Sequence, residues 1–163
     1  MQLNDEEQAM LAGAHGRAAQ LAITHQIKVG DFFDAADFVP VTQAHIMADT
    51  ESLGQAGVQW LEKLADANGG GVRIPTITDP RGTDFTQRDT LGHFDWMLEL
   101  ESRAIEAFKR LGVSMTDTCI NYQTVLAATR GEHVAFGDTG VVISSNTVNG
   151  ARSNVWPSPS TRG

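Results

Sequence analysis

The sequence has 163 residues, the length of one domain, and its 41% hydrophobic and 20% charged residues are typical of a soluble globular protein. The formal net charge is −8, and the 12 basic residues are scattered singly, which argues against nucleic acid or an anionic membrane surface as a partner. No apolar run approaches the roughly 20 residues of a membrane span, and the acidic N-terminus is unlike a signal peptide. One cysteine cannot form an internal disulfide, so we expect a reducing, cytoplasmic location.

The first quarter of the chain predicts two helices and a strand. Apolar side chains recur at helical spacing as far as Ala22, although Gly13 and Gly16 weaken this first helix locally. A second, short helix is expected over residues 31–37. The apolar, β-branched run 38–41 predicts a buried strand.

Two longer helices and two further strands are expected in the middle of the chain. An apolar face predicts a helix over residues 52–67, which the following glycines end, and a clear amphipathic helix is expected over residues 91–111. Strands are expected over residues 72–77 and 113–120. The last apolar run is 141–143, after a less regular segment.

Strands that alternate with helices predict an α/β fold with a mostly parallel sheet and flanking helices. In such sheets, ligands bind in loops beyond the carboxyl ends of the strands. Four polar loops each follow a strand candidate or a short apolar run: 48–50, 78–82, 119–122 and 144–154. Their shared position predicts that they form one site.

The residues that bear chemistry leave several alternatives open when they are taken singly. Cys119 is either a small buried hydrophobe or a metal ligand, and one thiolate is a weak signal because a cluster usually takes three or four. A zinc-binding pattern is absent, because the sequence has no second cysteine and no pair of histidines at ligand spacing. His45 is the best placed of the five histidines because it follows a strand candidate, whereas His133 falls in an irregular segment.

Two polar loops have both a structural and a functional interpretation. The run 79–82, Asp-Pro-Arg-Gly, has the composition of a turn, but Arg81 can also bind a substrate carboxylate through two parallel hydrogen bonds. The run 146–154 is dense in small polar groups around Arg152 and is equally consistent with a plain loop. Residues 140–150 contain no phosphate-binding glycine pattern, so a nucleotide site is not indicated.

Several ordered blocks resemble the aconitase X family over nearly the whole chain to Asn154. The strongest block is Cys-Ile-Asn-Tyr-Gln-Thr at 119–124. The others are Gly-Glu-His-Val-Ala-Phe-Gly-Asp-Thr-Gly at 131–140, the run 145–154, Ala-His-Ile with Ala-Asp-Thr at 44–50, and 78–82.

The resemblance implies part of an aconitase-like catalytic domain and a hydro-lyase activity. Members of the family dehydrate small hydroxy acids, including cis-3-hydroxy-L-proline and mevalonate 5-phosphate, with an iron–sulfur cluster held by cysteines spread along a much longer chain. The motif forms in this sequence are more similar to the hydroxyproline branch. By resemblance, Cys119 is the first cluster ligand. The resemblance implies that Ala48, Asp49, Thr50, Asp79 and Pro80 line the substrate pocket. Further expected substrate-binding residues are Arg81, Asn146 and Arg152, and arginine and backbone donors would hold the carboxylate.

The resemblance also predicts what the chain lacks. We expect residues 1–154 to be a partial aconitase X catalytic domain and 155–163 to be a divergent, disordered tail, as in a truncated product. A lone chain would then be incomplete, because one thiolate cannot hold a cluster. A small domain or subunit is the expected partner. The rival interpretations are a non-catalytic remnant or binding module without the cluster, and a chain whose missing ligands come from another subunit.

Overall fold

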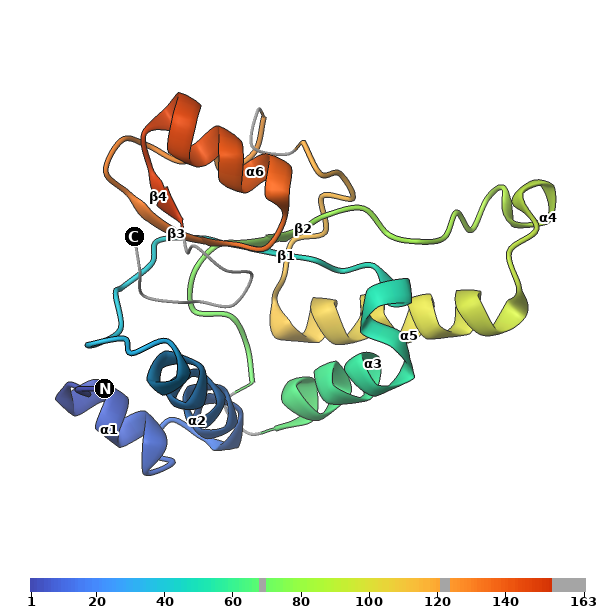
Figure 1. The fold of residues 1–163 in the computed structure, drawn as a ribbon. Helices are drawn as coiled ribbons and strands as arrows, with labels where there is room; N and C mark the ends of the chain where they lie inside the picture. The colour runs from blue at the N-terminus through green and yellow to red at the C-terminus, as the bar shows by residue number, and fades with distance from the viewer. Residues whose placement is uncertain (68–69, 121–123, 154–163) are drawn as a thin grey trace.

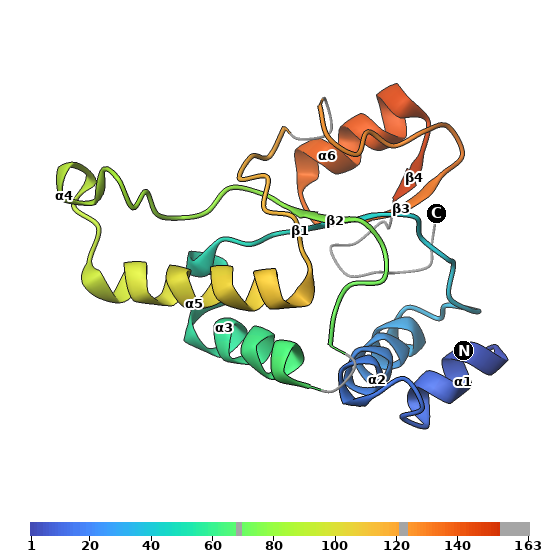
Figure 2. The ribbon, with the colours of Figure 1, turned by 180° about the vertical axis from the view of Figure 1, so that it is seen from behind.

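The computed structural model describes residues 1–67, 70–120 and 124–153, and it places a parallel sheet between two layers of helices (Figure 1). One layer, above the sheet, contains α6 and η2, and the other contains α3 and α5. The reverse view in Figure 2 shows the same layers, with α1 and α2 beside the lower one. The expected α/β class with a mostly parallel sheet is therefore confirmed. The elements are α1 (Asp5–Leu11), α2 (Arg17–Phe32), β1 (Ala44–Ile46), α3 (Thr50–Asp66), β2 (Thr76–Thr78), α4 (Arg88–Leu91), α5 (Asp95–Leu111), β3 (His133–Phe136), α6 (Thr139–Ser144), η2 (Ser145–Asn149) and β4 (Arg152–Ser153).

The sheet has the order β2-β1-β3-β4, and every pairing in it is parallel. His45 in the central strand β1 is in register with Ile77 of β2 on one side and Phe136 of β3 on the other. Parallel neighbours end at the same edge of a sheet, so the loops after β1, β2 and β3 begin close together.

The N-terminal helix is broken where the glycines predicted weakness. Gly13 and Gly16 both have φ of +88°, which is left-handed backbone that glycine adopts without steric penalty. The chain therefore forms α1 and α2 instead of one continuous helix. The expected second helix over 31–37 is wrong, because α2 continues through Phe32 and ends there.

The strand positions differ from those expected, because each strand is much shorter than the apolar run that predicted it. Residues 38–41 form no strand and line a groove with α1 and α2 instead, and pairing begins at Ala44, whose N–H donates to the Pro75 carbonyl. The predicted strand 72–77 is reduced to Thr76–Thr78. Of 113–120, Ser114 alone among the described residues makes a bridge, to Ile77, and Asp117 turns the chain with φ of +52°.

The apolar runs predicted neither strand β3 nor helix α6. β3 lies in the segment described as irregular, where buried Val134 and Phe136 alternate with half-buried His133 and Ala135. The apolar run 141–143 is helical, because the Asp138 side chain accepts hydrogen bonds from the N–H groups of Gly140 and Val141 and so caps α6.

The two long helices, α3 and α5, were predicted and form the layer below the sheet. Gly54 interrupts α3 with φ of +57°, which separates its first turn from the rest. Val58 of α3 and Phe108 of α5 are almost completely buried in the core that these helices share with the sheet. A second core lies on the opposite face, where Phe136 packs with Val141 of α6.

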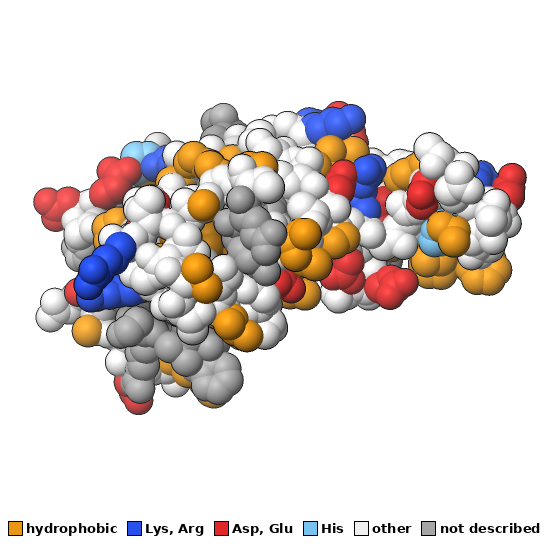
Figure 3. Space-filling view, turned by 90° about the horizontal axis from the view of Figure 1, so that it is seen from above, with side chains coloured by type: hydrophobic (Ala, Val, Ile, Leu, Met, Phe, Trp, Pro, Cys, Tyr) orange, Lys and Arg blue, Asp and Glu red, His pale blue; other side chains and the backbone are white. Residues whose placement is uncertain are grey.

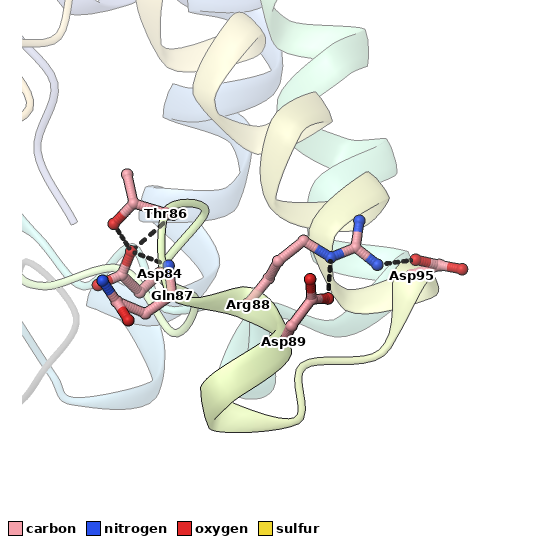
Figure 4. Close-up of polar contacts among 6 residues, drawn as sticks. All are labelled: Asp84, Thr86, Gln87, Arg88, Asp89 and Asp95. Atoms are coloured by element: carbon pink, nitrogen blue, oxygen red, sulfur yellow. Dashed lines mark hydrogen bonds and ion pairs between the residues drawn. The ribbon is translucent and has the colours of Figure 1, made fainter.

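A long loop carries α4 away from the sheet (Figures 1 and 2). Figure 4 shows how side chains organise this arm. The Asp84 carboxylate accepts hydrogen bonds from the Thr86 hydroxyl and from the N–H groups of Thr86 and Gln87. Arg88 at the start of α4 pairs with Asp89 and with Asp95 at the start of α5. These contacts lower the pKa of Asp84 and raise that of Arg88.

Hydrophobic side chains gather at the end of this arm and over the upper layer, as Figure 3 shows from above. The exposed fractions reach 64% for Phe94 and Trp96 and 80% for Val148. None of the helices in the described part of the chain combines the length and apolarity that a membrane span requires.

The buried position of Phe108 predicts a large effect on stability. Its side chain is 2% exposed between α3, α5 and the sheet. We expect Phe108→Ala to lower the free energy of unfolding by about 3–5 kcal/mol, because it removes buried apolar contacts and leaves a cavity. Urea unfolding followed by circular dichroism measures this loss. The control, Phe94→Ala, removes a side chain that is 64% exposed and should change stability by about 0.5 kcal/mol or less; equal losses would contradict the assignment of the core.

Candidate functional site

The candidate site lies at the carboxyl edge of the sheet, where the loops after β1, β2 and β3 are joined by hydrogen bonds. The Asp79 N–H donates to the Ile46 carbonyl at 3.1 Å, and the Gly137 N–H donates to the His45 carbonyl at 3.1 Å. A Cβ on Gly137 would lie 3.3 Å from that same carbonyl oxygen, so the approach of this loop to β1 favours glycine. The Ala48 N–H donates to the Asp79 carboxylate and joins the first two loops directly.

Two aspartates begin helices at this edge. Asp49 accepts a hydrogen bond from the Ser52 N–H at 2.7 Å and caps α3. Asp138 accepts one from the Gly140 N–H at 2.8 Å and caps α6. Each helix therefore begins at the strand ends, with its first free N–H groups bound to an aspartate side chain. The two carboxylates that cap these helices are thereby held in place at the site.

Asp79 is the buried carboxyl group of the site, with 6% of its surface exposed. Burial raises the pKa of Asp79 above its ordinary value, and the negative charges of Asp49 and Asp138 raise it further. The hydrogen bond from Ala48 opposes this rise. The charges of Asp49 and Asp138 therefore act on Asp79, and three carboxyl groups gather at this edge of the sheet.

Glu101 is a site residue that the sequence interpretation missed. It is 1% exposed on α5, and its carboxylate accepts hydrogen bonds from the hydroxyls of Thr50 at 3.0 Å and Thr83 at 3.2 Å. Glu101 therefore fixes the loops after β1 and β2 from below. A glutamate at the same helical spacing as the apolar residues of predicted helix 91–111 was the signal that could have revealed it.

His45 lies within β1, not after a strand as expected, and is 3% exposed. Burial lowers the pKa of its imidazole, while the negative charge of Asp138 acts in the opposite direction. His45 and Phe136 have ring centroids 6.2 Å apart in an edge-to-face arrangement, so His45 lies on the α6 side of the sheet. The neutral imidazole is thus enclosed beneath the acidic edge.

The structure brings some of the predicted substrate-binding residues together and leaves others apart. Ala48, Asp49, Thr50, Asp79 and Pro80 lie on the first two loops, next to one another.

Three further predicted residues have other contacts. Arg81 pairs with Asp117 at 2.7 Å. Asn146 lies on η2 and exchanges hydrogen bonds with Ser153 at the end of β4, and Arg152 is exposed on β4 itself. β3 separates this pair from β1, so their role in binding a carboxylate stays a prediction.

Neither of two hollows in the structure is lined by Asp49, Asp79 or Asp138. A hollow of about 190 Å³ lies between the starts of α3 and α5 and is lined by Thr50, Trp96 and Leu100 among others. A larger groove of about 490 Å³ lies between α1, α2 and residues 38–41, which precede β1. Small-molecule sites typically measure 300–1,000 Å³, so the first hollow is small for a complete site.

The geometry agrees with the comparison to known sequences. Residues 1–161 match the sequence profile described as the aconitase X first domain. This chain belongs to the aconitase X family. The matched region includes every segment on which the resemblance was based, while the expected change of character after residue 154 lies outside the described residues.

Relatives of two kinds are similar to this aconitase X chain. The phosphomevalonate dehydratase large subunit of Methanosarcina mazei is 29% identical over 98% of the chain, which spans 40% of that relative. The cis-3-hydroxy-L-proline dehydratases of Hypocrea jecorina and Pseudomonas aeruginosa are each 30% identical, over 96% and 92% of the chain, and the chain spans 26% of each. The chain thus corresponds to well under half of the length of these relatives.

A solved structure has the same fold. The crystal structure of Thermococcus kodakaraensis aconitase X in its holo-form superposes with a TM-score of 0.85 and 27% sequence identity, over 98% of this chain and 39% of the other. The four-stranded sheet and its helical layers are therefore the fold of an aconitase X first domain.

Cys119 meets one requirement of the cluster ligand that the aconitase X resemblance implies. It is a free, exposed thiol two residues beyond Asp117, and its segment is joined to the β2 loop through Arg81–Asp117 and through the Thr116 hydroxyl, which donates to the Thr78 carbonyl. The number of ligands is not sufficient, however. Within residues 1–67, 70–120 and 124–153, no three His, Cys, Asp or Glu side chains are grouped so that they could hold a metal ion. These residues fit one ligand, not a whole cluster.

Glu101 predicts that stability depends on one buried carboxylate. Replacing it by alanine leaves the Thr50 and Thr83 hydroxyls without their acceptor. We expect Glu101→Ala to lower the free energy of unfolding by about 2 kcal/mol or more, and Glu101→Gln, which keeps an acceptor oxygen, by less. The control is Glu106→Ala at an exposed position of the same helix. Chemical unfolding compares the three variants, and a control that loses as much as Glu101→Ala would show that the hydrogen bonds contribute little.

The raised pKa of Asp79 predicts a pH dependence of stability. Because this pKa is higher in the folded chain than the ordinary 3.8, the stability it contributes is present at low pH and is lost as pH rises through the folded pKa. Asp79→Asn stays neutral and retains an acceptor for the Ala48 N–H. Its stability relative to wild type should therefore increase as pH rises above 3.8 and then level off. Urea unfolding at several pH values tests this. The exposed control Asp37→Asn should show a constant difference, and a flat profile for Asp79→Asn would refute the effect.

Proposed function

We propose that this chain is the first domain of a dehydratase that removes water from a small hydroxy acid such as cis-3-hydroxy-L-proline. The single observation that carries the proposal is the joined edge of β1 and β2, where the Asp79 carboxylate accepts the Ala48 N–H. Five residues expected to bind substrate meet there in a chain of the aconitase X family.

The acidic edge supports hydroxyproline over mevalonate 5-phosphate. The ring nitrogen of hydroxyproline is a cation at neutral pH, and the charges of Asp49 and Asp138, which raise the pKa of Asp79, attract such a group. Mevalonate 5-phosphate carries only negative charge, which the same carboxylates repel. Relatives named for either activity have nearly equal identity, so sequence similarity does not separate the substrates.

The described residues also define what each group contributes. Asp79 accepts the Ala48 N–H through its carboxylate and so holds the first loop against the second, where the substrate is proposed to bind. Glu101 orients Thr50 at the end of the first loop. An iron–sulfur cluster, held in part by Cys119, would supply an open iron site that acts as a Lewis acid on the leaving hydroxyl.

The remaining ligands and the second wall of the site are proposed to come from a partner. The chain spans 40% or less of its relatives, and its described residues lack a metal-binding group of three. The partner is therefore proposed to be the rest of an aconitase X protein, with its small domain or small subunit. A non-catalytic binding module is the rival, and the same shortage of ligands favours it if no such partner exists.

Anaerobic reconstitution with ferrous iron and sulfide tests the proposal. The chain is treated alone and mixed with the part of the Pseudomonas aeruginosa dehydratase that it does not match. We expect an iron–sulfur absorbance and dehydration of cis-3-hydroxy-L-proline in the mixture. Both should be lost in Cys119→Ser and kept in Ile120→Ala, which changes the adjacent, exposed side chain.

The same mixture separates the two substrates and the rival function. The charge argument predicts a higher kcat/KM for cis-3-hydroxy-L-proline than for mevalonate 5-phosphate, and the reverse order would refute that argument. A mixture that forms a stable complex but takes up no iron would support the binding module.

A further inference from the structure

His45 is enclosed in the sheet although its polar atoms have nothing to bind. The side chain is 3% exposed, and among the described residues neither Nδ1 nor Nε2 has a hydrogen-bond partner. Its neighbours in register are Ile77, which is 1% exposed, and Phe136, which is 2% exposed. Most buried polar groups in proteins are hydrogen-bonded, so an exception of this kind requires a physical explanation.

Gln43 is a second buried side chain with a polar atom that has no hydrogen-bond partner among the described residues. It precedes His45 by two residues, so the two side chains share the α6 side of the extended chain. Gln43 is 5% exposed, and its Oε1 is also buried without a partner among the described residues, although its amide nitrogen donates to Glu132. Three buried polar atoms of these two neighbouring side chains thus have no partner in the described part of the chain, which points to a polar ligand there.

The chemistry of a neutral imidazole restricts what that ligand is. Burial lowers the pKa of His45, and the charge of Asp138 offsets only part of the effect, so one nitrogen is a donor and the other an acceptor. A carboxylate can serve only the donor, and an ammonium group only the acceptor. A hydroxyl group can serve either nitrogen, and it can also donate to Gln43 Oε1.

The place of His45 connects this chemistry with the site. Its carbonyl accepts the Gly137 N–H, one residue before Asp138, and the ring lies within the range of the charge of Asp138. The enclosed ring is thus directly beneath the edge at which the substrate is proposed to bind.

We propose that His45 is a hydroxyl-binding residue of this site, whose ring nitrogens bind either buried water or the hydroxyl of the substrate. The substrate alternative rests on the proposed function, whereas the water alternative does not. Either source supplies the same O–H chemistry to the ring.

Nitrogen-15 NMR of the histidine rings in the full chain tests this proposal. The His45 signals are assigned by their loss in His45→Gln, and the exposed His25 is an internal reference in the same spectra. We expect His45 to titrate below the ordinary value of about 6.5. Its ring-nitrogen shifts should show hydrogen bonding in the free chain if water binds, and only with cis-3-hydroxy-L-proline present if the substrate hydroxyl binds. A ring that titrates near the ordinary value, or a ring without hydrogen bonds both alone and with cis-3-hydroxy-L-proline, would overturn the proposal.

A matched pair of compounds distinguishes the two sources of the hydroxyl. cis-3-Hydroxy-L-proline and L-proline differ only in that group. If the substrate hydroxyl binds His45, the hydroxyproline changes the ring-nitrogen shifts and proline does not. If buried water binds, neither compound changes them, and a magnetisation-transfer contact between water and the ring protons is present. Failure of the proposed dehydratase activity leaves this second result intact, so the two failures are distinguishable.

A shape-matched variant addresses the alternative of a dry core. His45→Phe keeps an aromatic ring beside Phe136 but has no polar atoms. The proposal predicts that a water contact to the ring protons of the neighbouring Phe136, or the response of the β1 backbone amide signals to cis-3-hydroxy-L-proline, disappears in this variant. Either signal unchanged in a folded His45→Phe chain would overturn the assignment to His45.

Discussion

The contact between the Ala48 N–H and the Asp79 carboxylate is the interaction on which the candidate site depends. β1 and β2 are each three residues long, so few ladder hydrogen bonds hold them in register. The Asp79 side chain adds a bond just beyond the strands and joins their loops. It is buried, and the hydrogen bond from the Ala48 N–H offsets part of the cost of burying its carboxylate. Thr50 and Thr83 are then fixed through Glu101 from the helix below.

The electrostatics of the edge follow from how its helices begin. Asp49 and Asp138 are present because α3 and α6 need caps, yet the same two charges act on Asp79 and His45. Capping of a helix is by itself a structural role. In an aconitase X first domain, the result is also a group of carboxyl side chains at the carboxyl edge of the sheet. The relatives are more than twice as long as this chain.

The sequence predicted the fold class and the long helices well, because α3 and α5 have sustained apolar faces. It predicted the strands poorly. Strands of two to four residues are too short for periodicity, so the longer apolar runs 38–41 and 113–120 were more prominent than Ala44–Ile46. The run 141–143 became helical because a cap decided the local structure. Two of the ordered motif blocks fall on the loops after β1 and β2 that the Asp79 side chain joins, but Glu101 and the enclosed His45 depend on tertiary packing that spacing does not encode.

The pairing of the sheet also constrains how the chain is built. β1 lies in the centre of the sheet and pairs with β3, where Ala135 is in register with Ala44 of β1. These two residues are far apart in the sequence. Closing such a long loop is entropically unfavourable before its contacts form, whereas α3 and α5 can pack on each other earlier. As the chain leaves a ribosome, the lower helical layer is therefore available well before β1 acquires its second partner. Until then His45 and Gln43 face water, and they become enclosed only when β3 and α6 arrive.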